Sequence, residues 1–243
     1  MEILERFKEI ISTQDNPFVI EFGACDGYHT EIMLQILNSQ KPNYIYHLFE
    51  PVKYLIEPII DKLKSNSRVK AFNEAVGSKT GSFTFYESSG GGVREDGTII
   101  DGYYGSSSIR KPKMVLEYYK EMKFAETICN SITFDDYLIR ENLTDRIVDF
   151  IWADIQGAEV DLILGGKKAF KNVRYFFTEY CDAELYEGEI TLEKILELMP
   201  DFEVVEDYKG DVLLKNKMSF KAFVSKLLYL LYLLLSIPEK LSY

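Results

Sequence analysis

The chain has 243 residues, of which 47% are hydrophobic and 28% are charged, so disordered, collagen-like and low-complexity proteins are excluded for most of its length. This length is enough for one large domain with a buried core. The 28 basic and 39 acidic residues give a formal net charge of −11, which argues against general nucleic-acid binding because such a protein would repel the phosphate backbone.

The cysteines and the N-terminal residues indicate the cellular compartment of the protein. The three cysteines lie far apart and form no CxxC pair, which argues against a disulfide framework and a zinc site. The first residues carry charges throughout and lack the apolar core of a signal peptide. We therefore expect a reducing, cytoplasmic location.

The first elements follow from the spacing of apolar residues. A helical spacing predicts a helix over residues 2–12, which Asn16-Pro17 brings to an end. A continuous apolar run then predicts a buried strand over 18–22, followed by a small-residue turn and a helix over 29–38.

The same alternation continues along the chain and predicts an α/β fold. Strands are expected at 44–49, 69–72, 148–153 and 173–178, and helices at 52–64, 158–164 and 191–198. Strands that alternate with helices predict a mainly parallel sheet with helices on both faces. Near the end, residues 202–206 and 212–215 predict a hairpin that adds an antiparallel edge to this sheet.

Residues 88–110 interrupt the alternation. They contain six of the 15 glycines and five serines, which predicts a long loop without regular structure. Two interpretations remain open for this loop, a substrate lid over the carboxyl edge of the sheet and a flexible surface insertion. No internal repeat and no convincing domain boundary accompany it.

The turn after the first strand has the composition of a cofactor-binding turn. It reads Glu21-Phe22-Gly23-Ala24-Cys25-Asp26-Gly27, so a ligand can approach the backbone and the start of the following helix. Glu50 ends the second strand 23 residues after Gly27, where a carboxylate can accept both hydroxyls of a ribose. Alternatively, Glu50 supports the start of the helix that begins near Pro51.

The residues of this turn also indicate which cofactor binds. The turn lacks the G-x-G-x-x-G pattern of dinucleotide sites, and a Walker lysine is absent. Glu21 would repel a pyrophosphate but attract the ammonium group of an amino acid. The turn therefore favours S-adenosylmethionine over NAD.

Several segments, taken in order, carry a family resemblance. They are the acidic turn at 21–27, Asn73-Glu74-Ala75-Val76-Gly77, residues 81–86, residues 131–137, and the D-x-Q-G-x-E pattern at 154–159 after its strand. Over residues 16–182 the chain resembles the FkbM family of S-adenosylmethionine-dependent methyltransferases. Cys25 departs from the commoner pattern, which has a glycine there.

The resemblance implies O-methylation of a hydroxyl, often on a sugar or polyketide. It also implies a Rossmann-like class I methyltransferase sheet with the strand order 3-2-1-4-5-7-6. The implied cofactor contacts run along the edge of this sheet: Glu21, Gly23, Ala24, Asp26 and Gly27 in the turn, Glu50 and Pro51 at the ribose, Asn73, Glu74 and Ala75 near the adenine, and Asp154 beside the methionine part.

Candidate catalytic groups lie at the same edge. A hydroxyl acceptor has a high pKa, so a base that removes its proton should help transfer. Asp154, Glu159 and Glu179 follow adjacent strands, and His29 follows the turn. Each has a structural alternative: Glu159 is in the first turn of its helix, His29 helps to start its helix, and Glu179 accepts a structural hydrogen bond.

The same carboxylates could also bind a divalent metal. Asp154, Glu179 and Asp182 would supply oxygen ligands for a hard cation. Because the chain has 39 carboxylates, chance explains such a cluster better, and no metal site is predicted.

The C-terminal residues differ from the rest of the chain. We expect a methyltransferase domain over 1–215 and a basic apolar helix over 216–243, with five lysines and one acid in residues 214–243. Its uncharged run at 227–237 is too short to span a bilayer, which takes about 20 residues. Residues 217–237 are instead expected to lie at a membrane interface, to pack on the sheet, or to contact a second subunit in a homodimer.

The predicted function is therefore S-adenosylmethionine-dependent methylation of a sugar or glycoconjugate hydroxyl, with a glycan or lipid-linked sugar as acceptor. Two alternatives remain: a nucleotide-dependent oxidoreductase on a similar sheet, and a methyltransferase fold that binds without catalysis. Acceptor specificity is expected within residues 88–125, which carry no pattern that names the acceptor.

Overall fold

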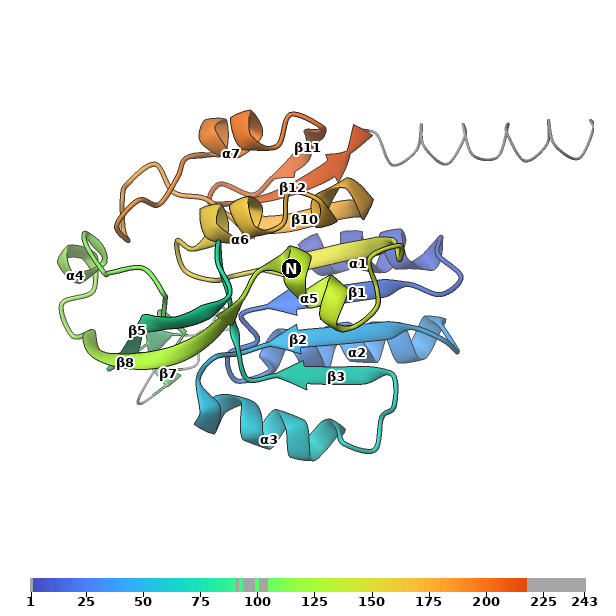
Figure 1. Cartoon of the computed structure of the whole chain (residues 1–243), viewed down its shortest axis with the longest axis horizontal. Helices are drawn as coiled ribbons and strands as arrows, with labels where there is room; N and C mark the ends of the chain where they lie inside the picture. The colour runs from blue at the N-terminus through green and yellow to red at the C-terminus, as the bar shows by residue number, and fades with distance from the viewer. Residues whose placement is uncertain (1, 91, 94–98, 101–104, 218–243) are drawn as a thin grey trace, which may run out of the picture.

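The computed structural model of the chain describes residues 2–90, 92–93, 99–100 and 105–217 (Figure 1). Its elements follow in chain order: α1 (Glu2–Ser12), β1 (Phe18–Phe22), α2 (Tyr28–Gln40), β2 (Ile45–Phe49), α3 (Lys53–Leu63), β3 (Val69–Phe72), β4 (Ala75–Val76), β5 (Gly81–Ser89), β6 (Gly92–Val93), β7 (Ile99–Ile100), α4 (Val115–Tyr118), β8 (Lys123–Ile132), α5 (Phe134–Arg140), β9 (Val148–Ala153), α6 (Glu159–Gly165), the 3-10 helix η1 (Ala169–Asn172), β10 (Val173–Glu179), α7 (Leu192–Leu198), β11 (Phe202–Asp207) and β12 (Asp211–Asn216).

Seven of the described strands form the main sheet, in the order β11-β12-β10-β9-β1-β2-β3. Strand β1 pairs in parallel with β2 and β9, β2 with β3, and β9 with β10. Counted along the chain within this sheet, the order is 3-2-1-4-5-7-6, as the family resemblance implied. The predicted hairpin is also confirmed: β12 runs antiparallel to β10 and β11, and β11 forms the edge.

Helices cover both faces of this sheet, as predicted. Every residue of β1 is buried, and alternate side chains enter two separate cores. Val19 packs with α1, α2 and α3 side chains such as Phe7, Leu37 and Ile56. Its neighbour Ile20 packs in the other core, with side chains of α5, α6 and α7. A strand buried on both faces reads as a continuous apolar run, which is why the sequence marks it clearly.

A second, three-stranded sheet of order β4-β8-β5 was not predicted. Strands β5 and β8 pair antiparallel over their length, from Gly81 opposite Ser131 to Ser89 opposite Lys123. Figure 1 shows this pair, together with α4, on the side to which β1, β2 and β3 point. The small sheet therefore lies next to the carboxyl edge of the main sheet.

The predicted loop over 88–110 is described only in part. Strands β6 and β7 pair antiparallel, and the backbone of Ser108 exchanges hydrogen bonds with that of Tyr86 at 2.8 and 3.0 Å. Residues 91, 94–98 and 101–104 lie outside the described residues, so both interpretations of this loop remain predictions. The same applies to the tail, because residues 218–243 lie outside them as well. In the part of the chain that is described, no helix combines the length and the apolar character needed to cross a membrane.

Candidate active site

The turn after β1 brings the ends of three strands together. The N–H groups of Gly23 and Ala24 both donate to the Phe49 carbonyl oxygen at 3.0 Å, and the Asp154 N–H donates to the Phe22 carbonyl oxygen at 3.0 Å. Gly23 has a φ of +89°, and a Cβ added there would collide with the Asp154 carbonyl oxygen. Only glycine fits this position, because the missing Cβ lets the backbones at the ends of β1 and β9 meet.

The Glu21 side chain is buried directly beneath the turn, with 1% of its surface exposed. Its Oε2 accepts hydrogen bonds from the hydroxyls of Thr30 at 2.5 Å and Tyr46 at 2.6 Å. Burial raises the pKa of this carboxyl to about 7, and the nearby charge of Asp154 adds to the rise. Glu21 therefore titrates close to neutral pH.

Glu50, at the end of β2, closes the turn from the other side. Its Oε2 accepts the Cys25 N–H at 2.8 Å, and its Oε1 accepts the Val52 N–H at 2.8 Å. Cys25, where the commoner motif has glycine, has a φ of +49° in the left-handed region. Burial raises the pKa of Glu50 to about 7. Each carboxylate oxygen of Glu50 accepts one of these two N–H donors and can accept a further hydrogen bond. Glu50 can therefore support the start of α3 and still accept a ligand hydroxyl.

Asp154 and Glu179 form a carboxyl pair at the ends of β9 and β10. Gln156 lies between them, and its Nε2 donates to Asp154 Oδ1 at 2.6 Å and to Glu179 Oε2 at 3.0 Å. Burial raises the pKa of both carboxyls, and the charge of Asp154 raises that of Glu179 further. Because both carboxyls accept from the same amide and the charge of Asp154 disfavours that of Glu179, ionising both at once is costly.

Gln156 and Tyr186 were not singled out from the sequence as site residues. Gln156 has a φ of +54°, which turns its side chain back toward the carboxyl pair. The Tyr186 hydroxyl contacts Gln156 Oε1 at 3.4 Å and donates to the Ser106 carbonyl oxygen at 2.7 Å. The D-x-Q-G-x-E pattern contained the signal for Gln156, but nothing local marks Tyr186.

Glu159 lies in the first turn of α6, with 3% of its surface exposed. Its Oε1 accepts the N–H of Ile155, which lies four residues earlier in the chain, at 3.2 Å. Burial raises the pKa of Glu159 to about 8. The contact orders the segment that carries Gln156.

His29 faces the same cluster from α2. Its ring lies 4.7 Å from that of Trp152, measured between centroids, and its charge would act to lower the pKa of Asp154. The His29 Nε2 atom is buried, and no hydrogen-bond partner for it is found among the described residues. A buried polar atom without a partner indicates a site for an additional ligand or water.

The three residues expected near the adenine contact different parts of the protein. The Asn73 amide donates to the carbonyl oxygens of Glu50 at 3.0 Å and Pro51 at 2.9 Å, which ties the end of β3 to the end of β2. Ala75 is buried in β4. The Glu74 carboxylate instead pairs with Arg140 at 2.8 Å.

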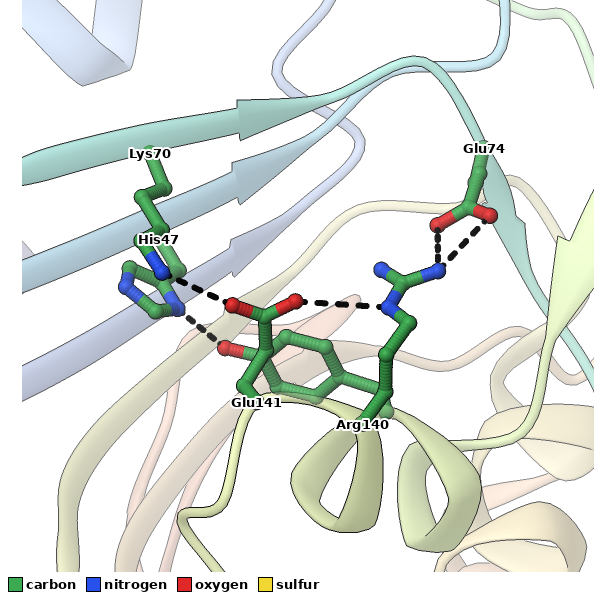
Figure 2. A network of polar contacts seen from close by, with 6 residues as sticks. His47, Lys70, Glu74, Arg140 and Glu141 are labelled. Carbon is green, nitrogen blue, oxygen red and sulfur yellow. Dashed lines mark hydrogen bonds and ion pairs between the residues drawn. The ribbon is translucent and has the colours of Figure 1, made fainter.

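Figure 2 places that ion pair in a polar network beside the sheet. Arg140 also contacts Glu141 at 3.3 Å, Glu141 pairs with Lys70 at 2.8 Å, and the His47 ring bonds the Tyr137 hydroxyl. Burial lowers the pKa of His47 to about 4, so this histidine is neutral. The network joins β2, β3 and α5 to the segment that carries Asn73.

The remaining candidates lie at the rim. Asp26 is exposed and accepts the Tyr28 N–H at 3.1 Å, while Gly27, the buried residue just before α2, has a φ of +82°. Asp182 is exposed as well. Among the described residues, no group of three or more histidine, cysteine, aspartate or glutamate side chains is arranged to hold a metal ion.

Comparison with known proteins decides the family. The family model described as the methyltransferase FkbM domain matches residues 21–209. The chain belongs to this family. The 2-O-methyltransferase NoeI of Sinorhizobium fredii (strain NBRC 101917 / NGR234) is 32% identical over 220 residues, which cover 88% of this chain and 86% of that protein.

Two solved structures are also similar to this FkbM methyltransferase. One is the methyltransferase FkbM from Methylobacillus flagellatus KT, with a TM-score of 0.49 and 13% identity over 83% of this chain and 44% of that one. The other is the N-methyltransferase NodS from Bradyrhizobium japonicum WM9, with a TM-score of 0.42 and 9% identity over 88% of this chain and 94% of that one. The chain thus spans less than half of the length of the first. The family match confirms the predicted methyltransferase and displaces the oxidoreductase alternative.

Proposed function

We propose that this FkbM methyltransferase transfers a methyl group from S-adenosylmethionine to a hydroxyl of a sugar or glycoconjugate. The observation that carries the proposal is the set of buried carboxyls with raised pKa values at one sheet edge: Glu21, Glu50, Asp154, Glu159 and Glu179. Such an edge favours a cationic ligand, because a positive charge offsets the cost of ionising buried acids. The name of the relative NoeI, a 2-O-methyltransferase, supports oxygen as the atom that receives the methyl group.

The residues present fit this cofactor. The absence of a side chain at Gly23 lets the ends of β1 and β9 meet, which brings Asp154 next to the turn, and the start of α2 follows the turn. Glu21 and Asp154 would hold the amino-acid part, Glu50 the ribose hydroxyls, and the segment at Asn73–Ala75 the adenine. When bound, the cofactor supplies a methyl group activated by a sulfonium charge.

The Asp154–Glu179 carboxyl pair would act as the base for the acceptor hydroxyl. A base works best when its pKa is close to the operating pH, and burial moves the Asp154–Glu179 pair upward toward that range. In its ionised form, the pair would take the proton of the acceptor hydroxyl as the oxygen becomes bonded to carbon. Gln156 fixes the orientation of both carboxyls, and His29 in its neutral form, whose Nε2 has no partner among the described residues, would offer a second acceptor for the same proton.

Calorimetric titration of the full chain with S-adenosylmethionine and S-adenosylhomocysteine tests the cofactor. We expect micromolar affinity that Glu50→Ala reduces by about tenfold or more, because each good hydrogen bond to an ionised group contributes 1.5–3 kcal/mol. Glu57→Ala is the matched control, since Glu57 is exposed on α3 and pairs only with Lys53 among the described contacts.

Methyl transfer onto a panel of free sugars and glycoconjugates, followed by mass spectrometry, tests the acceptor. Transfer to a hydroxyl supports the proposal. A folded wild-type protein that binds neither cofactor form would overturn it and leave a binding module without catalysis.

A further inference from the structure

A groove with a volume of 390 Å³ lies outside the carboxylate cluster. Its lining includes Phe83 and Tyr86 from β5, Ser78 before β5, and Asp161 from α6. Arg110, Lys111 and Glu187 complete the polar part of the lining. The volume is within the range of small-molecule sites, about 300–1,000 Å³.

The polar floor of this groove is fixed by the protein itself. Asp161 accepts the Ser78 hydroxyl at 2.9 Å and pairs with Arg110 Nε at 2.6 Å. The Arg110 side chain also donates to the Glu187 carbonyl oxygen at 2.6 Å. A Cβ at Gly188 would collide with that guanidinium, so glycine there makes room for it. The floor therefore needs little reorganisation when a ligand binds.

The charges in the groove cancel. Arg110 is paired with Asp161, and Lys111 lies 3.9 Å from Glu187. With two positive and two negative groups, the groove has no net charge with which to select an anion or a cation. What it presents is aromatic surface from β5 beside hydrogen-bond donors and acceptors. This combination suits a neutral ligand that has both apolar ring faces and many hydroxyls, which is the chemistry of a sugar ring.

The groove and the carboxyl pair are separated by one dividing wall, made of residues 106–111 and 186–187. On one side of the wall, Tyr186 contacts Gln156 and holds the Ser106 carbonyl oxygen. On the other side, the next residue, Glu187, lines the groove with Arg110. Asp161, which lines the groove, lies two residues after Glu159 in α6 and therefore points to another side of that helix. The groove and the carboxyl pair are thus neighbours through the dividing wall, which contacts Gln156 on one side and lines the groove on the other.

We propose that this groove is a second sugar subsite, which holds a further ring of a neutral oligosaccharide acceptor. The proposal rests on the proposed function, because it assigns a place to the part of a glycan that is not methylated. It predicts that the enzyme prefers oligosaccharides to the corresponding single rings, and that the groove causes this preference.

The test uses the full chain and arrays of neutral mono-, di- and trisaccharides. Tyr86→Ala removes an aromatic contact, and Thr84→Trp places a large ring in the groove from an exposed position. Tyr118→Ala is the control, since Tyr118 is 63% exposed on α4 and does not line the groove. We expect both groove variants to weaken oligosaccharide binding by about tenfold, to leave single rings unchanged, and to keep the wild-type melting temperature.

The outcomes separate this proposal from the proposed function. Wild-type retention of oligosaccharides that both groove variants lose supports the subsite, even when no sugar is methylated and the proposed function fails. Failure of the wild-type protein to bind any oligosaccharide overturns the subsite. Methyl transfer to single rings and oligosaccharides with the same kcat/KM, unaffected in both groove variants, also overturns it while leaving the proposed function in place.

Discussion

At the scale of single residues, the site depends on carboxyl groups that the fold keeps out of water. Glu21 and Glu50 are 1% and 5% exposed, so their charged forms are costly until a ligand or a hydrogen bond compensates. The ammonium and sulfonium groups of S-adenosylmethionine would together supply this compensation. The ionisation of these acids and the binding of the cofactor are therefore expected to be coupled.

This coupling predicts a pH-dependent cofactor affinity. Because the pKa values of Glu21 and Glu50 are about 7 in the free protein, protons compete with a cation below that pH. Affinity for S-adenosylmethionine should rise about tenfold between about pH 6 and pH 8 for each carboxyl that must ionise. S-adenosylhomocysteine lacks the sulfonium charge and should show a shallower rise, which titration at both pH values measures. Equal slopes for the two compounds would mean that the charge does not face the cluster.

Gly23→Ala tests the close approach of β1 and β9. The new Cβ would meet the Asp154 carbonyl oxygen, and the φ of +89° adds backbone strain, so we expect loss of cofactor binding and a stability lower by about 2 kcal/mol or more. Gly210→Ala is the matched control. It also has a positive φ, +130°, but a Cβ there meets no atom within 4 Å. If calorimetric binding and thermal unfolding change equally in both variants, strain alone explains the effect and the close approach has no role.

The residues of the site differ in how far the sequence reveals them. Glu21, Glu50 and Asp154 come at the ends of apolar strands, so a strand prediction places them at one edge. Tyr186 is different, because its contacts reach Ser106, which is 80 positions away in the chain. Glu74 stands in a recognisable segment, yet its carboxylate pairs with Arg140 from α5. Side-chain direction at such positions depends on tertiary contacts that no local pattern contains.

At the scale of elements, strands buried on both faces were predictable and partly exposed strands were not. Strand β9 is buried throughout and appears in the sequence as an apolar run. Strand β8 has Ile128 at 73% exposure, and its buried residues gather toward one end. Strand β8 forms because it pairs with β5. A pairing between two separate segments leaves no pattern in the sequence of β8 alone.

The dividing wall is the element whose contacts are easiest to test. Tyr186→Phe removes the donor to the Ser106 carbonyl oxygen at 2.7 Å, so we expect a loss of about 1–3 kcal/mol in unfolding free energy and slower methyl transfer. Tyr119→Phe serves as the control, because Tyr119 is 58% exposed on the neighbouring segment. Denaturant titration and initial rates measure the two effects. Unchanged rates in Tyr186→Phe would show that the wall does not position the catalytic edge.

At the scale of the whole molecule, the buried acids set how stability depends on pH. Glu21, Glu50 and Glu159 have folded-state pKa values of about 7, 7 and 8, above the 4.5 of an exposed glutamate. Between these values the folded protein binds more protons than the unfolded chain, so stability falls as pH rises. Shifts of this size correspond to about 3 kcal/mol each for Glu21 and Glu50 and about 5 kcal/mol for Glu159. Carboxyls with a lowered folded-state pKa, such as Glu141, stabilise the protein fully at any pH above about 4.5. Because this contribution is constant above that pH, it does not oppose the fall in stability.

The prediction is a free energy of unfolding that decreases from about pH 5 to about pH 8 in the absence of cofactor. Glu159→Gln should flatten this decrease, because the amide has no charge to bury and its oxygen can still accept the Ile155 N–H. Charge repulsion within a chain of net charge −11 would also lower the stability as pH rises. Added salt distinguishes this cause, because salt screens surface charges far more than buried ones. Denaturant titrations at both pH values, with and without salt, measure each contribution. A stability that rises over this range, or an equal slope in Glu159→Gln, would show that the carboxylate edge is already compensated in the free protein and does not need a cationic ligand.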